Sequence, residues 1–307
     1  MAAVTEMIAS EAPAEAGATM DDLPANLQQV IVTLAAEPAF PLSSLSRMAG
    51  VCRLWRKIAL ELLAGIAVLD LRVCGREREG SPGAAFCAAL PHLLARCPAL
   101  REVHARHVYA CQGHAAMLLD GLTGCAKLEL LNVAFVNFAG LQFDVLGDFA
   151  RRCAAPGAPR LRRLDLIGCG AAVGRGAFVA DLLHLTHLNV AFCRSFNPPR
   201  GWLVGGAGGV PPRVLPLRYL DLRMCDDLDL RELTEGAAAA QVQELNLAFV
   251  AAAGNSALLE LAAMPELGKL TLGARTDNLW VHGGWTGGGL QEFRRRRPDV
   301  EVALRYS

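Results

Sequence analysis

Four side chains of types that bind metal ions lie within one short stretch, at His104, His107, Cys111 and His114. Imidazole nitrogen and thiolate sulfur are preferred zinc ligands, and the spacing H-x2-H-x3-C-x2-H would suit zinc. However, His104 and His107 fall on an expected strand and the turn after it, where neighbouring side chains point to different faces. We therefore interpret these residues as surface histidines and expect neither a metal ion nor another cofactor.

Sequence motifs of common enzyme classes are missing. The chain has no G-x-S-x-G, H-E-x-x-H, P-loop or C-x-x-C, and the glycine-rich stretch 168–173 lacks the third glycine of a dinucleotide fingerprint. We expect a protein that is not an enzyme. A metal-dependent enzyme is the remote alternative, and the zinc content of the purified protein would decide between the two.

Charge and hydropathy exclude further classes. Lysine plus arginine and aspartate plus glutamate number 30 each, which leaves no basic excess for nucleic acid. No window reaches the 18 or so uninterrupted apolar residues of a membrane span. The first 20 residues lack a secretory signal and are expected to form a disordered acidic tail. We therefore expect a cytoplasmic or nuclear protein with reduced cysteines.

A frame of the form L-x-x-L-x-L recurs along the sequence and predicts a short strand in each copy. The eight copies are Ile66-Leu69-Leu71, Leu100-Val103-Ala105, Leu128-Leu131-Val133, Leu161-Leu164-Leu166, Leu185-Leu188-Val190, Leu217-Leu220-Leu222, Val242-Leu245-Leu247 and Leu267-Leu270-Leu272. Three residues after the frame, Cys74, Cys169, Cys193 and Cys225 recur in half of the copies. A compact side chain with a weak donor suits a chain that turns inward there, so we interpret these thiols as structural.

Helix-like stretches with apolar residues at three- and four-residue spacing separate the frames, around Phe86 to Leu94, Phe178 to Leu183 and Leu258 to Ala262. Gly/Pro-rich segments near 75–83, 153–160 and 197–216 lengthen three units and are expected to be loop insertions. The alternating segment 300–304 predicts a last strand. The basic run from Arg294 to Arg297 is interpreted as a solvated helix end, with a nuclear-import patch as the alternative.

The stretch 63–307 resembles the leucine-rich repeats, in particular their cysteine-containing subclass, on the segments NVAFC (189–193) and DLRMC (221–225). This resemblance implies about eight units of strand plus helix, stacked so that each unit buries the apolar face of the next. The expected fold class is an α/β solenoid, a horseshoe of parallel strands with helices and loops outside, preceded by a small three-helix module over 21–62.

That module carries the pattern L-P-x-x-L-x-x-V-I-x-x-L, followed by L-x-x-M-x-x-V-C-R-x-W, and resembles an F-box. The resemblance implies docking to a Skp-type adaptor and, through it, to a cullin–RING ubiquitin ligase. The gap between Leu34 and Leu45 is longer than in the family. A plain helical cap for the solenoid is the alternative. The positions carried over as adaptor contacts or F-box core are Leu23, Pro24, Leu27, Ile31, Leu45, Val51, Cys52 and Trp55.

Residues between the apolar positions of each frame are expected to line the concave face, because side chains alternate along a strand. They form a mixed-charge polar strip with one tyrosine, which suits a protein or peptide better than a phosphate backbone. The candidate substrate-binding residues are His104, Asn132, Arg163, Asp165, His187, Asn189, Tyr219, Asp221, Glu244, Asn246 and Lys269, and the same strip includes Glu102 and Thr271.

Phe135, Phe192 and Phe249 recur within N-[VL]-A-F and would either form an aromatic binding row or pack at the turn, which we favour. The apolar spot Trp202-Leu203-Val204 is either a second contact or low-complexity sequence. The expected function is the substrate-recognition subunit of an SCF-type ubiquitin ligase with an unknown protein substrate. The alternative is a repeat scaffold for protein interaction that works without a ligase.

Overall fold

The computed structural model describes residues 53–71, 90–106, 114–136, 138, 144–173, 176–194, 196, 198, 204–205, 213–225, 228, 230, 233, 241–250, 252–274 and 284–306. The chain divides into two compact units, Met1–Leu63 and Ala64–Ser307. The expected acidic tail, most of the F-box-like module and the insertion near 75–83 lie outside the described residues. The sequence-based domain bounds stay predictions.

Helix α4 (Arg53–Gly65) is the described element of the first unit. Its last two residues lie beyond Leu63, where that unit ends. Ile58, Ala59 and Leu63 are buried, whereas Lys57 and Glu61 are exposed and lie 4.0 Å apart as an i,i+4 pair. The helix therefore has one apolar face. A single helix does not show an F-box-like module.

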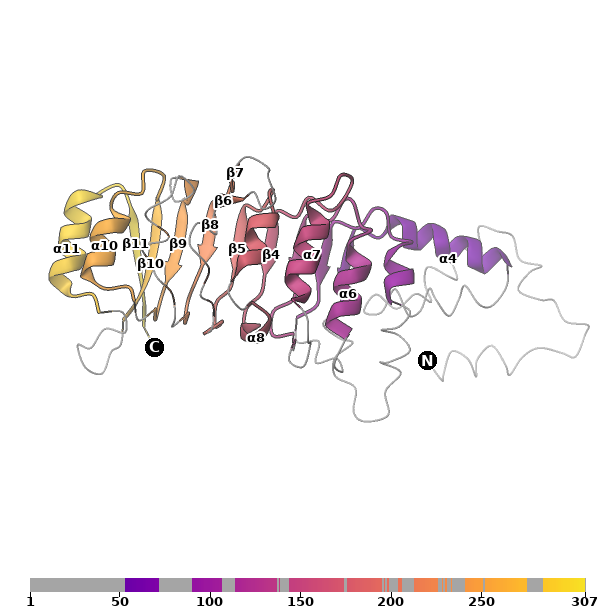
Figure 1. Ribbon diagram of the computed structural model, residues 1–307, viewed down its shortest axis with the longest axis horizontal. Coiled ribbons are helices and arrows are strands. Elements are labelled where there is room, and N and C mark those ends of the chain that lie inside the picture. Colours follow the sequence, from indigo (N-terminus) through magenta and orange to yellow (C-terminus); the bar gives the residue numbers. More distant parts are fainter. Residues whose placement is uncertain are drawn as a thin grey trace, which may run out of the picture. The chain divides into compact units, whose positions relative to one another are not determined.

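In the second unit, nine parallel strands form one sheet in the order β1-β2-β3-β4-β5-β8-β9-β10-β11 (Figure 1). This sheet with its helices is an α/β solenoid, in agreement with the expected repeat architecture. The strands are β1 (Val68–Asp70), β2 (Glu102–His104), β3 (Leu130–Asn132), β4 (Arg163–Asp165), β5 (His187–Asn189), β8 (Tyr219–Asp221), β9 (Glu244–Leu247), β10 (Lys269–Ala274) and β11 (Glu301–Tyr306).

The strands pair so that the middle apolar residue of every frame lies in one continuous line. That line contains Leu69, Val103, Leu131, Leu164, Leu188, Leu220, Leu245, Leu270 and Val302. The first eight side chains are at most 2% exposed. A slip by one residue would turn these side chains to the other face, so burial of the frames sets the register.

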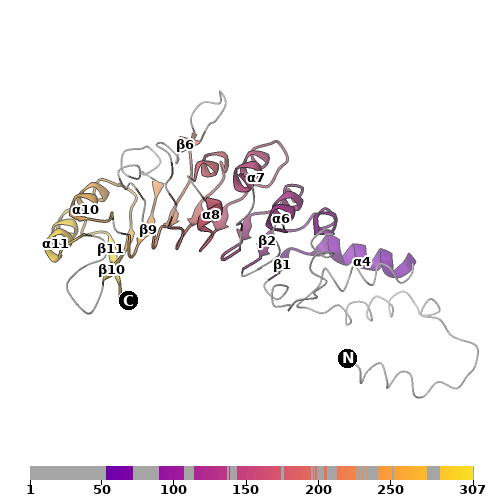
Figure 2. The ribbon, with the colours of Figure 1, turned by 60° about the horizontal axis from the view of Figure 1, so that its bottom comes forward.

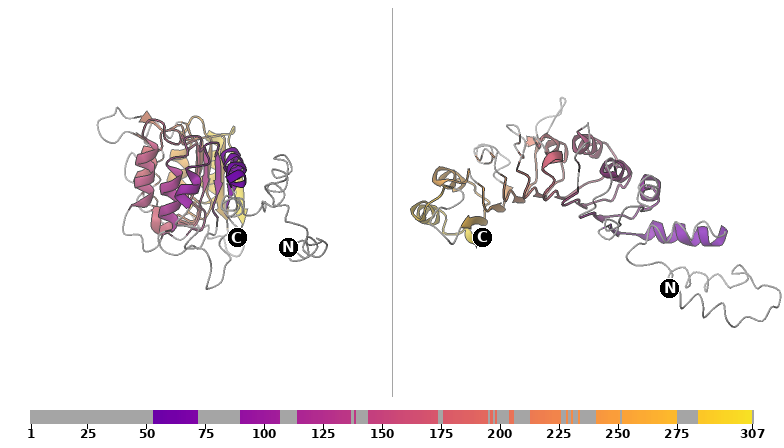
Figure 3. Two further views of the ribbon diagram at one scale, coloured as in Figure 1. Left: turned by 90° about the vertical axis from the view of Figure 1, so that its right-hand side faces the viewer. Right: turned by 90° about the horizontal axis from the view of Figure 1, so that it is seen from below.

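The helices lie together on one face of the sheet, outside its curve (Figures 2 and 3). A helix with its side chains is about 10 Å wide and strands are only about 4.8 Å apart, so stacked units curve away from the helices. The helical segments of this unit are α6 (His114–Leu122), α7 (Val145–Cys153), α8 (Gly170–Val173), the 3-10 helix η2 (Ala177–Asp181), α10 (Asn255–Leu261) and α11 (Gly287–Arg296).

Two of the segments expected to be insertions are described in part. Within 197–216, β6 (Val204–Gly205) and β7 (Arg213–Val214) form a two-stranded antiparallel sheet, a pairing that the expected loop does not include. After Cys153, residues 154–158 form turns and bends. Trp202 and Leu203 lie outside the described residues.

Three of the recurring cysteines link neighbouring units. The thiols of Cys169, Cys193 and Cys225 donate to the carbonyl oxygens of Val133, Leu166 and Val190, at 3.1, 3.2 and 3.3 Å. Each acceptor is the last apolar residue of the preceding frame. Burial raises the pKa of Cys169 to about 12 and that of Cys193 to about 11. These protonated, enclosed thiols agree with a structural interpretation.

Candidate functional site

Two rows of side chains cross the sheet on the face opposite the frame leucines. The first row precedes the middle apolar residue and contains Val68, Glu102, Leu130, Arg163, His187, Tyr219, Glu244, Lys269 and Glu301. The second row follows it and contains Asp70, His104, Asn132, Asp165, Asn189, Asp221, Asn246, Thr271 and Ala303. The sequence-predicted strip combines both rows.

The second row is largely hidden from solvent. Asn132, Asp165, Asn189, Asp221 and Thr271 are between 1% and 8% exposed. In a sheet each of these side chains lies close to the side chains of the same row on both adjacent strands, and these neighbours shield it from solvent. A partner would therefore meet the first row before the second. Whether these residues bind a substrate stays a prediction.

The second-row asparagines stabilise the turn at the end of each strand. The side-chain oxygens of Asn132, Asn189 and Asn246 each accept a hydrogen bond, at 3.1 Å, from the backbone N–H two residues later. Asp221 accepts the same bond from the Arg223 N–H, also at 3.1 Å. An acceptor two residues before a backbone N–H favours a tight turn, so these side chains serve the backbone.

The residue after each of these turns has a left-handed backbone conformation, with φ of 57° at Phe135, 62° at Phe192, 58° at Met224 and 61° at Phe249. Such angles are uncommon outside glycine. They are stabilised because the N–H groups of Phe135, Phe192 and Met224 donate to the next repeat at 2.6, 2.7 and 3.2 Å. The N-[VL]-A-F motif is thus a turn that links repeats.

The three phenylalanines differ in exposure. Phe135 and Phe249 are half-buried, and their rings lie where glycines of the next repeat, Gly168 and Gly273, leave room. This is the packing role that we favoured. Phe192 has Arg223 rather than a glycine beside it, with the guanidinium 5.9 Å from the ring centre, and 47% of Phe192 is exposed.

An aromatic stack lies at the centre of the first row. His187 and Tyr219, on adjacent strands, have ring centres 5.8 Å apart and planes at 24°. Thr186 Oγ1 lies 2.8 Å from His187 Nδ1. Partial burial and the charge of Arg163 lower the pKa of His187. Burial and the nearby carboxylate of Asp221 raise the pKa of Tyr219 to about 12, so both rings are neutral near pH 7.

Two arginines beside the stack are held by buried carboxylates. Arg163 Nε lies 3.2 Å from Asp165 Oδ2, and Arg223 donates to Asp221 at 3.0 to 3.1 Å. The Tyr219 hydroxyl also donates to Asp221, at 3.4 Å. These ion pairs fix the guanidinium groups before any partner arrives. We define the central patch as Arg163, His187, Phe192, Tyr219, Arg223 and Glu244.

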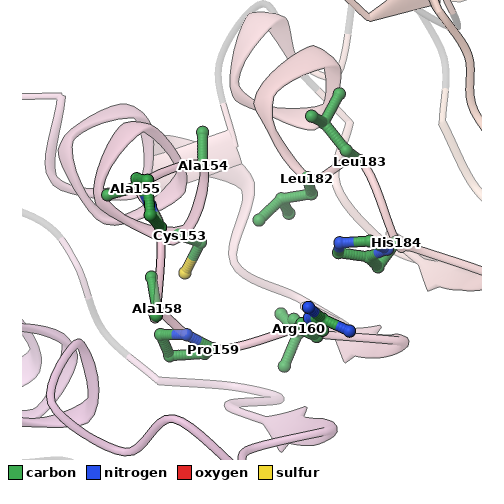
Figure 4. A pocket seen from close by; sticks show the side chains of 12 residues that line it. Cys153, Ala154, Ala155, Ala158, Pro159, Arg160, Leu182, Leu183 and His184 are labelled. Atoms are coloured by element: carbon green, nitrogen blue, oxygen red, sulfur yellow. The ribbon is translucent and has the colours of Figure 1, made fainter.

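A small pocket of about 230 Å³ lies before the first residues of strands β4 and β5, where α7 leads into β4 (Figure 4). Cys153, Arg160, Leu182 and His184 are among its lining residues, and the Cys153 sulfur is turned into the space. Burial raises the pKa of Cys153 to about 12, so this thiol would be a poor nucleophile at neutral pH. The pocket does not resemble a catalytic centre.

The remaining sequence-predicted residues are described only in part. Seven of the F-box-like positions lie outside the described residues, namely Leu23, Pro24, Leu27, Ile31, Leu45, Val51 and Cys52. Trp55 lies in α4. His104 Nε2 lies 3.4 Å from Glu102, whereas His107 and Cys111 are not described. Within the described ranges, His, Cys, Asp and Glu form no group of three suited to a metal ion.

No protein-family model matches the sequence, and no curated protein sequence matches it. A solved complex of Rad7 and Elc1 in yeast aligns with 98% of this chain and 90% of that chain, at 12% identity and a TM-score of 0.32. Such a low score carries no argument about function. None of the described helices is long and apolar enough to cross a membrane.

Proposed function

We propose that this chain is the substrate-recognition subunit of an SCF-type (cullin–RING) ubiquitin ligase and binds a target protein on the concave face of its solenoid. The single observation that supports target binding is the central patch, in which a stacked His187–Tyr219 pair lies between arginines held in place by ion pairs. Tyrosine and arginine are the residue types that most often dominate binding energy at protein interfaces.

The charge pattern of the patch favours a protein target. Arg163 and Arg223 carry positive charge, but each is paired with a carboxylate, and exposed Glu244 follows Tyr219 in the first row. A nucleic-acid site would need a continuous basic face. A rigid aromatic centre with charges of both signs around it suits a protein segment with polar and apolar side chains.

The ligase half of the proposal rests on the sequence pattern that resembles an F-box. The Leu23-Pro24 start and the Val51-Cys52-Arg53-x-Trp55 end precede the repeats directly. The chain itself would carry out no chemistry. It would hold the target close to the ubiquitin-transfer subunits and so raise the effective concentration of the reacting groups.

The adaptor half is tested by co-purifying the chain with a Skp-type adaptor and a cullin. The Leu23→Ala/Pro24→Ala double variant is expected to lose adaptor capture. Lys57→Ala, at an exposed position of α4, is the matched control and should capture normally. Undiminished capture by the double variant would refute adaptor docking through the F-box-like module, and a wild-type chain that captures no cullin would favour the ligase-independent scaffold.

The target half is tested by quantitative pull-down from cells with the proteasome blocked. Tyr219→Ala is expected to reduce recovery of the target about tenfold, the loss that truncating an anchor residue typically causes. Val68→Ala, at an exposed position of the same row outside the predicted strip, should leave recovery unchanged. If both variants recover the target like the wild type, the central patch is not the binding surface.

A further inference from the structure

The last strand of the sheet, β11, has an open edge in the described part of the chain. β10 pairs with one side of β11, and no described strand pairs with its other side (Figure 1). Val302 and Leu304 of β11 are half-buried, whereas Leu270 and Leu272, their partners in β10, are 0% exposed. The apolar face of the sheet is therefore incompletely covered at this end.

The backbone groups of this open edge can be assigned. Glu301 N–H donates to Gly268 at 2.8 Å, toward β10. In a parallel strand, consecutive residues direct their N–H and C=O groups to opposite sides. At the position of Leu304 in inner strands, Val133, Leu166 and Val190 donate onward to the following strand at 2.7 to 3.0 Å. Val302 and Leu304 therefore present their N–H and C=O groups to the open edge.

We propose that the open edge of β11 pairs with β11 of a second copy of this chain, antiparallel and centred on Ala303. In this register Glu301 lies opposite the partner's Arg305, and Val302 lies opposite the partner's Leu304. The two-fold axis repeats both pairs, so a six-residue strand contains its own complement. Glu301 and Arg305 are exposed and have no ion pair within the described part of the chain, so both are available for this contact.

The hydrogen-bond pattern agrees with this register. Antiparallel strands alternate between hydrogen-bonded pairs and closer pairs without such bonds. Val302 and Leu304, which point their backbone groups outward, would form the hydrogen-bonded pairs. Glu301 and Arg305 would form the closer pairs, in which opposite charges interact best. A shift by two residues would keep the hydrogen bonds but set Glu301 or Arg305 opposite Ala303, so charge selects the register centred on Ala303.

Burial favours the same arrangement. Residues directly opposite each other in an antiparallel pair share a face of the sheet. The half-exposed Val302 and Leu304 would therefore cover the partner's Leu304 and Val302 on the apolar face. Glu301 and Arg305 would lie on the face that carries the central patch. An edge left uncovered is prone to uncontrolled pairing, and a self-complementary strand limits that pairing to one partner.

The test is sedimentation of the full chain over a concentration series, with the molar mass as readout. The wild type is expected to dimerise. Glu301→Arg alone and Arg305→Glu alone each replace two attractive pairs by two like-charged pairs, and each should weaken the dimer roughly tenfold or more. Both side chains are exposed, so a wild-type circular dichroism spectrum and a single cooperative thermal transition should show that the variants remain folded.

The decisive measurement mixes the two single variants. One then carries only arginine and the other only glutamate at the paired positions, so the mixed dimer regains two attractive pairs and should form although neither variant dimerises well alone. The Glu301→Arg/Arg305→Glu double variant should also dimerise like the wild type. A wild type that stays monomeric at high concentration would overturn the proposal. A dimer whose stability does not respond to these charge changes would overturn it as well, because another surface would then form the contact. This proposal does not depend on the proposed function.

Discussion

The ring of Phe135 lies against the backbone of Gly168, one repeat later in the solenoid. A β-carbon placed on Gly168 would be only 2.5 Å from Cδ1 of Phe135. Gly168 also has φ +70°, in the left-handed region where only glycine is free of strain. At this position glycine therefore satisfies two requirements that no other residue type satisfies.

Gly168→Ala is therefore expected to lower the free energy of unfolding by about 2–4 kcal/mol, from backbone strain and from the clash with Phe135. Denaturant unfolding measures the loss. Gly157→Ala is the matched control, because Gly157 has φ +80° but a β-carbon added there would have no atom within 4 Å. It should lose only the strain, about 1 kcal/mol. Equal losses in both variants would show that the Phe135 contact is unimportant.

The ion pair of Asp221 and Arg223 supports a second prediction. Asp221 is 1% exposed, and Arg223→Ala would leave its carboxylate buried without a positive partner. Because about a third of the arginine is exposed, we expect a loss below that of a fully buried pair, about 2 kcal/mol. Chemical unfolding at pH 7 provides the measurement.

A second substitution tests the cause of that loss. Asn occupies the position of Asp221 in both adjacent strands, at Asn189 and Asn246. The Arg223→Ala/Asp221→Asn double variant keeps the turn acceptor without the charge, so it should regain most of the stability. If the double variant is as unstable as Arg223→Ala, the loss comes from arginine packing and not from an unpaired carboxylate.

The pKa of His187 supports a prediction on pH dependence. It lies below the ordinary value of 6.5 because partial burial disfavours the charged ring and Arg163 repels it. As the pH falls, His187 therefore takes up its proton in the unfolded chain before it does so in the folded chain. The contribution of neutral His187 to the free energy of unfolding is complete above about pH 6.5 and is lost as the pH falls through the folded-state pKa. An NMR titration of the imidazole should have its midpoint below 6.5.

Two variants complete this test. Arg163→Gln removes a repelling charge and should move the His187 midpoint upward. His187→Gln removes the titrating group and should flatten the difference in unfolding free energy between pH 7.5 and 5.5. A His187 midpoint at or above 6.5 would contradict the described environment of the ring.

Much of the solenoid follows from the sequence alone. Each frame places its middle apolar residue on the buried face, because a strand alternates sides and only one face is covered by helices. The same local requirement applies in every unit, and Leu131, Leu164 and Leu188 accordingly fall into one paired line. The position of the cysteines follows from the sequence as well, because Cys169 and Cys193 occupy the same place in their units, and there each thiol donates to the preceding frame.

The binding surface depended on contacts between units, which the sequence of a single unit does not contain. Both polar rows alternate with apolar residues, yet the packed neighbours bury Asn189 and leave His187 exposed. Phe192 and Phe135 share the motif N-V-A-F, but Phe135 packs beside Gly168 and Phe192 lies beside Arg223. The sequence by itself determined the repeat, its register and its buried thiols. Only the tertiary structure decided which polar and aromatic side chains reach solvent, because the next unit covers or exposes each of them.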